Sequence, residues 1–176
     1  MLHEYWKWEE GTVPKDVCDT FIERYDDKLH KGTVSDGKMN TDIRLSDVVM
    51  VGDDDIKNIF LDFCNVANDN AFGFNIYPLV ECQYTKYNGS ENGRYKWHID
   101  LSVGARKASD RKISCIIMLS DPSEYDGGDF YLGGERIELK KGSVIAFPSF
   151  LAHQVTEVTS GTRRTFVAWQ SGPKFI

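Results

Sequence analysis

The sequence predicts a mainly β fold, in which helices are confined to the N-terminal part and a jelly-roll core follows them. Apolar residues recur at helical spacing only before about residue 70, whereas short β-rich runs bounded by Gly, Pro, Asn and Asp follow one another from residue 72 onward. Many strands at short intervals without helices between them are typical of an antiparallel sandwich or barrel. We therefore expect one domain over residues 1–176, with helical support at about 1–70 and a double-stranded β-helix (jelly-roll, cupin-like) core at about 72–172.

Two N-terminal segments carry the apolar periodicity of amphipathic helices. The first covers about residues 14–29, because Pro14 suits a first helical turn and apolar side chains follow it at helical spacing. The second covers about residues 54–68 and opens with the acidic letters "DDD", whose negative charge favours a helix N-terminus. The segment between the helices, 41–51, has a mixed pattern.

The expected strands of the core are nine short runs, each rich in β-branched or aromatic residues and bounded by turn residues. They cover residues 72–78, 80–87, 94–101, 112–120, 129–134, 135–140, 143–148, 153–159 and 163–170.

Composition excludes several functional classes. A net charge of −6 argues against a general phosphate-binding surface, because nucleic-acid affinity rests on clustered Lys and Arg. No apolar run reaches the roughly 18 residues of a membrane span, and acidic residues interrupt the N-terminal segment. We therefore expect a cytoplasmic protein with neither a nucleic-acid nor a membrane partner. The four cysteines form no C-x-x-C pair, so we expect reduced, mostly buried thiols.

A possible metal site begins with the letters "HID". Side chains alternate along a strand, so His98 and Asp100 are expected to point the same way. Alone, this pair is more easily read as two ordinary polar residues. His153 opens a later expected strand that can return beside the first. Two histidines and one carboxylate on one face of a metal form a triad suited to non-haem Fe(II), which leaves positions for a chelating cosubstrate and oxygen.

A carboxylate anchor is predicted in the last expected strand, where Arg163, Thr165 and Val167 share one face. An inward-facing arginine is costly unless it is paired, and a carboxylate ligand held by the guanidinium would supply the pair. Arg164 faces the other way, and we assign it a surface salt bridge.

Three stretches in order, from about Leu79 to Ser171, resemble one family. They are "YNG…YKWHID", "RKISCIIMLSDPSEYDGGDFYL" and "KKGSVIAFPSFLAHQVTEVTSGTRRTFVAWQS". The combination is similar to the Fe(II)- and 2-oxoglutarate-dependent dioxygenases of the prolyl 4-hydroxylase superfamily, and the N-terminal helices match only in general character.

The resemblance implies a role for each matching residue. His98, Asp100 and His153 would bind Fe(II), and Arg163 would pair with the C5 carboxylate of 2-oxoglutarate. Tyr87 matches a tyrosine that hydrogen-bonds the cosubstrate, and Thr165 could assist through its hydroxyl. The chain departs from the family at Met118, where some relatives offer a second tyrosine to the C5 carboxylate.

The resemblance also implies the substrate. Tyr95, Arg111 and Trp169 match residues that line a peptide groove in prolyl hydroxylases, where aromatic faces grip the proline ring and arginine donates to a peptide carbonyl. Arg44 and Asp47 could face the same groove, but we assign them no role. The polar segment 102–110 is expected to be a loop that closes over the substrate.

The expected reaction is hydroxylation of prolyl residues in a protein or peptide, with Fe(II), 2-oxoglutarate and O2, release of succinate and CO2, and ascorbate as reductant. Two alternatives stay open. One is a dioxygenase that acts on a free amino acid, another small molecule or a different protein side chain. The other is a catalytically silent cupin-like binding module. A zinc hydrolase fits less well, because no general base stands beside the expected ligands.

Overall fold

Two antiparallel sheets form the core of the protein, whose computed structural model describes residues 4–34, 37–101 and 108–175. The larger sheet has the strand order β1-β11-β7-β13-β5-β4-β2, and β8 pairs with β13. These strands are β1 (Trp6–Trp8), β2 (His30–Lys31), β4 (Asp47–Val51), β5 (Val80–Asn88), β7 (Ser109–Met118), β8 (Tyr125–Gly127), β11 (Val144–Pro148) and β13 (Val158–Pro173).

The smaller sheet faces the larger one and has the order β10-β9-β12-β6-β3. Its strands are β3 (Arg44–Leu45), β6 (Arg94–His98), β9 (Phe130–Leu132), β10 (Glu135–Ile137) and β12 (His153–Val155). Apolar side chains from both sheets, among them Ile116, Phe130 and Phe147, form a cluster between them. This arrangement of two antiparallel sheets confirms the predicted jelly-roll core.

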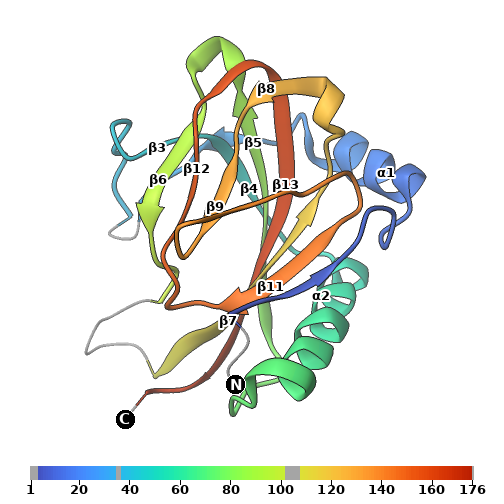
Figure 1. Cartoon of the computed structure of the whole chain (residues 1–176), viewed down its shortest axis with the longest axis vertical. Helices are drawn as coiled ribbons and strands as arrows, with labels where there is room; N and C mark the ends of the chain where they lie inside the picture. The colour runs from blue at the N-terminus through green and yellow to red at the C-terminus, as the bar shows by residue number, and fades with distance from the viewer. Residues whose placement is uncertain (1–3, 35–36, 102–107, 176) are drawn as a thin grey trace.

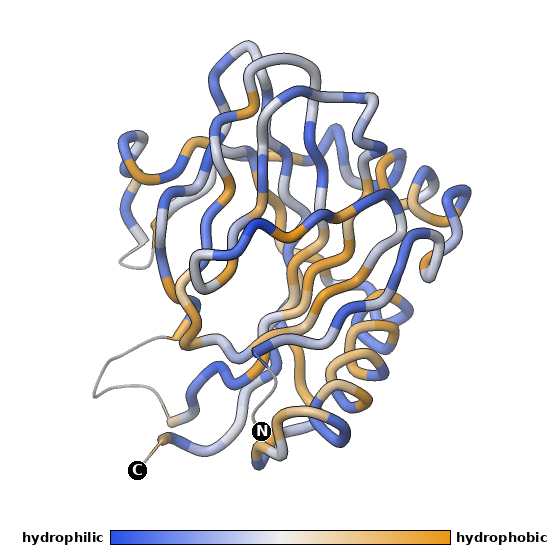
Figure 2. The backbone as a smooth tube through the Cα atoms, viewed as in Figure 1, coloured by the Kyte–Doolittle hydropathy of each residue, from blue (hydrophilic) through white to orange (hydrophobic). Residues whose placement is uncertain are grey.

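Two helices, α1 (Lys15–Tyr25) and α2 (Asp54–Ala67), pack on the outer face of the larger sheet (Figure 1). α2 buries Ile56, Phe60, Cys64 and Ala67 along one side. Hydropathy follows the same division, since apolar residues concentrate in the central strands and on the helices that cover them (Figure 2).

Strand β13 separates the helical side of the larger sheet from its inner side. Phe166 is fully buried, and its ring lies 5.2 Å from that of Phe21 and 6.3 Å from that of Phe60, which belong to the two helices. Because side chains alternate along a strand, Arg163 and Thr165 project from the opposite face, between the sheets. The helices therefore fix the strand that carries the predicted carboxylate anchor.

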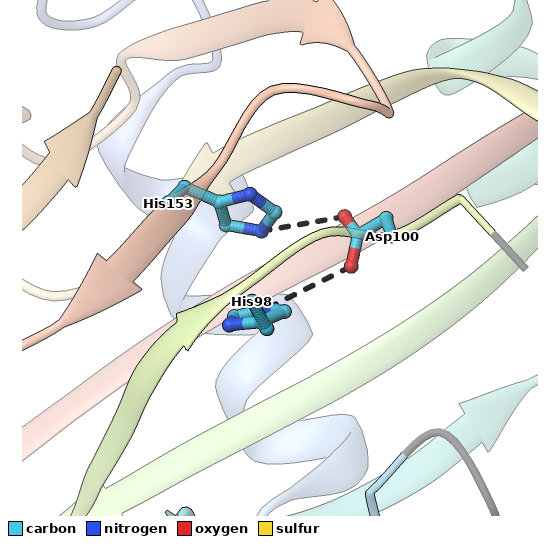
Figure 3. A group of neighbouring side chains, drawn as sticks. All are labelled: His98, Asp100 and His153. Carbon is cyan, nitrogen blue, oxygen red and sulfur yellow. Dashed lines mark ion pairs between the residues drawn. The ribbon is translucent and has the colours of Figure 1, made fainter. Parts of the chain in front are cut away.

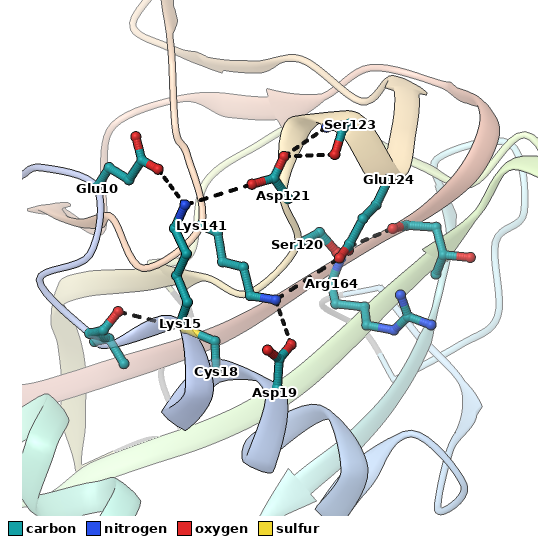
Figure 4. A network of polar contacts seen from close by, with 12 residues as sticks. Glu10, Lys15, Cys18, Asp19, Ser120, Asp121, Ser123, Glu124, Lys141 and Arg164 are labelled. Carbon is teal, nitrogen blue, oxygen red and sulfur yellow. Dashed lines mark hydrogen bonds and ion pairs between the residues drawn. The ribbon is translucent and has the colours of Figure 1, made fainter.

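Polar contacts tie α1 to the turns beside it (Figure 4). Lys141 Nζ, which is mostly buried, lies 2.5 Å from Asp19 Oδ1 on α1, and Lys15 Nζ lies 2.7 Å from Glu10 Oε1. Asp26, at the end of α1, accepts hydrogen bonds from Arg164 on β13. Arg164 thus has the salt bridge that its outward position predicts.

The N-terminal region contributes more than the helical support that the sequence predicted. It supplies four short strands. β1, β2 and β4 belong to the larger sheet, where β4 pairs with β5, and β3 belongs to the smaller sheet. The two helices are found where they were expected, but the first begins at Lys15 and ends at Tyr25 rather than near residue 29. His30, just beyond it, already pairs with Val48 in the sheet.

The prediction of a strand at residues 72–78 is wrong. A π-helical turn, Asn68–Phe72, extends α2, and Gly73 follows with a φ of +66°. The Asn68 side chain then occupies both backbone groups of Phe74, because its Oδ1 accepts from the Phe74 N–H and its Nδ2 donates to the Phe74 carbonyl. These two hydrogen bonds satisfy the backbone groups that Phe74 would otherwise offer to a neighbouring strand.

Other expectations have mixed outcomes. All four cysteines are free and buried, as predicted. Most of the expected loop at 102–110 lies outside the described residues, and its last two positions, Ser109 and Asp110, already belong to β7. Within the described parts of the chain, no helix is long and apolar enough to cross a membrane.

Candidate active site

A cavity of about 270 Å³ has walls from both sheets. The larger sheet contributes side chains from β5, β7 and β13, and the smaller sheet contributes side chains from β6 and β12. Every residue that the sequence analysis assigned to a site lines this one cavity: His98, Asp100, His153, Arg163, Tyr87, Thr165, Tyr95, Arg111 and Trp169.

His98, Asp100 and His153 lie together on one wall (Figure 3). Each offers one ligand atom, and the three atoms lie within 4.8 Å of one another. Asp100 Oδ1 is 3.7 Å from His98 Nε2, and Asp100 Oδ2 is 3.4 Å from His153 Nε2. The histidines face each other across the paired strands β6 and β12. This donor set fits a non-haem Fe(II) ion.

Hydrogen bonds fix which nitrogen each histidine presents. His98 Nδ1 lies 2.7 Å from the Lys96 carbonyl oxygen, and His153 Nδ1 lies 3.0 Å from the Leu151 carbonyl oxygen. A carbonyl can only accept, so both Nδ1 atoms carry a proton, and Nε2 is the nitrogen that each ring turns toward Asp100 and the metal position. Burial, together with nearby His153, lowers the pKa of His98 to about 4, so its ring is neutral at pH 7.

Asp100 is not on the strand that carries His98, as the sequence pattern assumed, because β6 ends at His98. Its position comes from the turn after β11, where the Ser149 carbonyl oxygen accepts from the backbone N–H groups of Asp100 and Leu101. Burial alone would raise the pKa of Asp100, but His153, His98 and a hydrogen bond from Ser114 outweigh it and lower the pKa below its ordinary value. The carboxylate is therefore ionised and ready to bind a cation.

Ser114 orients this carboxylate, because its hydroxyl donates to Asp100 Oδ2 at 2.7 Å. The Ser114 proton is thereby committed, so the 2.9 Å contact with Ser149 Oγ must have Ser149 as the donor. Both serines are fully buried. The two hydroxyls hold one carboxylate oxygen through a chain of directed hydrogen bonds.

We expect Ser114→Ala to weaken metal binding by about tenfold or more, since partners that orient a ligand typically contribute that much to affinity. Titration of Mn(II) into the metal-free protein, followed by calorimetry, measures the effect. Ser160→Ala is the matched control, because Ser160 also donates to a carboxylate, that of Asp126, but in an exposed place. Equal Mn(II) affinity of both variants and the unmodified protein would contradict the role of Ser114.

Arg163 is 2% exposed, yet it forms no ion pair with any described residue, and its Nε is buried without a hydrogen-bond partner. Its guanidinium lies 5.6 Å from the centre of the Tyr87 ring. Its neighbour Arg164 has two contacts with Asp26. A buried cation without a counterion is costly, so an anion bound beside Arg163 would stabilise it.

Tyr87 and Thr165 also lie beside Arg163, from the facing strands β5 and β13. Both are buried, and burial raises the pKa of the Tyr87 phenol, so it stays protonated and can donate. Met118 is fully buried opposite Thr165 and does not line the cavity. It supplies no hydrogen-bond donor there.

The three residues predicted to hold substrate lie on two walls. The Tyr95 ring stacks on His98, with centroids 3.5 Å apart. On β7 and β13, the Arg111 guanidinium lies 4.0 Å from the centre of the Trp169 ring and also pairs with Glu81. Trp169 Nε1 is buried without a hydrogen-bond partner in the described part of the chain. Trp169 thus places its ring, with a buried N–H that no described residue accepts, in the cavity wall.

Sequence reasoning missed further residues of the cavity. Arg44 is buried there, 4.6 Å from the centre of the Tyr95 ring, although we assigned it no role. Gln83 and Thr85 also line the cavity. Strand alternation with Tyr87 was the signal for these two, since residues 83, 85 and 87 share a face. Arg44 and Ser114 gave no comparable signal.

A family model described as the 2OG-Fe(II) oxygenase superfamily matches residues 82–171, the segment that holds all nine predicted site residues. A PKHD-type hydroxylase of Nitrosomonas europaea is 30% identical over 145 residues, which are 75% of this chain and 63% of that protein. The chain therefore spans less than two thirds of this relative's length.

Two solved structures share the fold. A prolyl-4-hydroxylase of Pseudomonas putida has a TM-score of 0.74 at 17% identity, covering 98% of this chain and 94% of that one. A prolyl hydroxylase of Trichoplax adhaerens, solved with a peptide fragment of the hypoxia inducible factor oxygen degradation domain, has a TM-score of 0.73 at 16% identity, covering 95% and 83%. These identities are low enough that the likeness shows the fold alone. With the family match over residues 82–171, the chain belongs to the 2OG-Fe(II) oxygenase superfamily.

Proposed function

We propose that this protein is an Fe(II)- and 2-oxoglutarate-dependent dioxygenase that hydroxylates prolyl residues in a protein or peptide. The observation that carries the proposal is the pairing, in one cavity, of a two-histidine, one-carboxylate cluster with a buried arginine that has no counterion in the described residues. A 2-oxo dicarboxylate that binds the metal held by this cluster and also pairs with Arg163 through its distal carboxylate would satisfy both.

Each wall of the cavity has a task in this proposal. His98, Asp100 and His153 hold the metal through their Nε2 and carboxylate atoms. Fe(II) bound there supplies the activation of O2 that couples loss of CO2 from the cosubstrate, giving succinate, to hydroxylation. Arg163 fixes the orientation of the cosubstrate through its distal carboxylate, and the Tyr87 hydroxyl donates beside it.

A peptide substrate, rather than a free amino acid, is favoured by Arg111 and Trp169, which line the cavity together. Trp169 Nε1 has no partner among the described residues, and Arg111 lies against the same ring with donors of its own. A peptide offers carbonyl oxygens on both sides of its target residue, whereas a free amino acid offers only its own carboxylate. The bound peptide in the Trichoplax adhaerens relative is consistent with this choice.

The proposal is tested by incubating the protein with a panel of proline-containing peptides, Fe(II), 2-oxoglutarate, O2 and ascorbate. We expect mass spectrometry to find one added oxygen on a prolyl residue, and succinate in equal amount. If succinate forms only with a small molecule or with a peptide that lacks proline, the proposed prolyl substrate is wrong and that compound's class takes its place. Binding of 2-oxoglutarate without succinate from any compound would favour a silent binding module.

Trp169→Phe should raise the KM for a peptide substrate by about five- to tenfold, because it removes one hydrogen bond but keeps an aromatic face. The kcat should change little, since the metal ligands and the cosubstrate anchor stay in place. Trp97→Phe is the matched control, because Trp97 is about half exposed and does not line the cavity. A KM equally affected in both variants would exclude a peptide contact at Trp169.

A further inference from the structure

Strand β5 adds a polar row to the cavity beside Arg163. Gln83, Thr85 and Tyr87 alternate with outward residues and all line the cavity. Strand β13 lies next to β5 (Figure 1). In this pairing Thr165 is opposite Thr85, and Arg163 is opposite Tyr87. Thr85 is therefore two residues along the strands from the pair of Tyr87 and Arg163, whose guanidinium has no counterion among the described residues.

The hydroxyl proton of Thr85 has a determined direction. Gln83 Nε2 donates to Thr85 Oγ1 at 2.9 Å, and an amide nitrogen can only donate. Thr85 is thus the acceptor in that bond, and its own proton is left to donate elsewhere. No described residue accepts it. Thr85 is 1% exposed and lines the cavity, so a ligand bound in the cavity can supply the acceptor.

Thr165 has a second neighbour opposite it, Met118 on β7, on the side away from Thr85. A thioether offers no proton, and Met118 does not line the cavity. Of the three described residues that are opposite one another here, Thr85, Thr165 and Met118, the two threonines are the ones with a hydroxyl to donate.

We propose that Thr85, directed by Gln83, donates a hydrogen bond to the distal carboxylate of 2-oxoglutarate, together with Thr165 and beside Arg163. This inference rests on the proposed function. A carboxylate has about four lone-pair sites, so a guanidinium that occupies two leaves the others to be filled by hydroxyl groups. Thr85 thereby adds to the recognition of the cosubstrate without touching the metal ligands.

The test compares two ligands by calorimetry on the full chain loaded with Mn(II), under conditions without turnover. 2-Oxoglutarate carries the distal carboxylate, whereas oxalate chelates a metal but has no distal group. Thr85→Val, which replaces the hydroxyl by a methyl of similar size, should weaken 2-oxoglutarate binding by about tenfold and leave oxalate binding unchanged. Thr85→Ser, which keeps the hydroxyl, should bind 2-oxoglutarate within about twofold of the unmodified protein.

Two results would overturn the inference. One is unchanged 2-oxoglutarate affinity in Thr85→Val, and the other is an equal loss for both ligands, which would indicate general damage to the cavity. If the unmodified protein binds oxalate but not 2-oxoglutarate, the proposed function itself fails, and the inference fails with it. The oxalate titration thus separates an error about Thr85 from an error about the cosubstrate.

Discussion

Asp100→Ala should weaken metal binding by more than about 100-fold. Loss of a residue that only orients a ligand costs up to about 100-fold in metal affinity, and Asp100 is itself a ligand. The substitution removes one of three ligands and also leaves Ser114 without its acceptor. Metal content after loading with Fe(II) without oxygen, and Mn(II) affinity by calorimetry, measure the effect. Turnover of 2-oxoglutarate should disappear with the metal.

The control for this variant is Asp129→Ala. Asp129 adjoins β9 in the same small sheet but pairs with Arg136 at the surface. It should keep full metal affinity, and circular dichroism should show the same fold for both variants. Full metal binding by Asp100→Ala would remove the assignment of the three ligands.

Arg163→Met should weaken 2-oxoglutarate binding by about 100-fold or more, because removing one partner of a buried charge pair costs about 2–5 kcal/mol. The same change should make the ligand-free protein more stable, because it removes a buried charge that has no counterion in the described residues. Calorimetric titration and thermal unfolding without ligand measure the two opposite effects.

Arg164→Met should behave in the reverse manner. It breaks the pair with Asp26, which joins α1 to β13, so stability should fall. The affinity for 2-oxoglutarate should not change, because Arg164 faces away from the cavity. A loss of stability in Arg163→Met with unchanged 2-oxoglutarate affinity would contradict the role of Arg163 as an anion anchor.

Strand periodicity explains why much of the site was predictable from the sequence. On β13, alternation alone distinguishes Arg163, which faces the cavity, from Arg164, which pairs with Asp26. The β core and both helices were predictable because each element buries one face, so its apolar residues repeat with the period of a strand or a helix. The functional roles of these residues stay predictions until the variants above are measured.

Contacts between distant segments explain what the sequence could not predict. Strands β1 to β4 are short, and they become strands because edges of the two sheets accept them, which no local pattern reveals. The segment expected as a strand at 72–78 instead has contacts with separate residues, since Phe74 binds the Asn68 side chain and the Tyr77 N–H donates to the Ser171 carbonyl. The hydrogen bond from Ser114 to Asp100 joins β7 to the end of β6, and nothing in the letters around Ser114 marks it.

The most direct test of this account is an optical titration of 2-oxoglutarate into the Fe(II)-loaded protein without oxygen. Chelation of Fe(II) by a 2-oxo acid gives a metal-to-ligand charge-transfer absorption, so the measurement requires no knowledge of the substrate. We expect a saturable band with one 2-oxoglutarate per chain in the unmodified protein, and its loss at the same ligand concentrations in Arg163→Met. Absence of the band in the unmodified protein, despite full occupancy by Fe(II), would contradict the account.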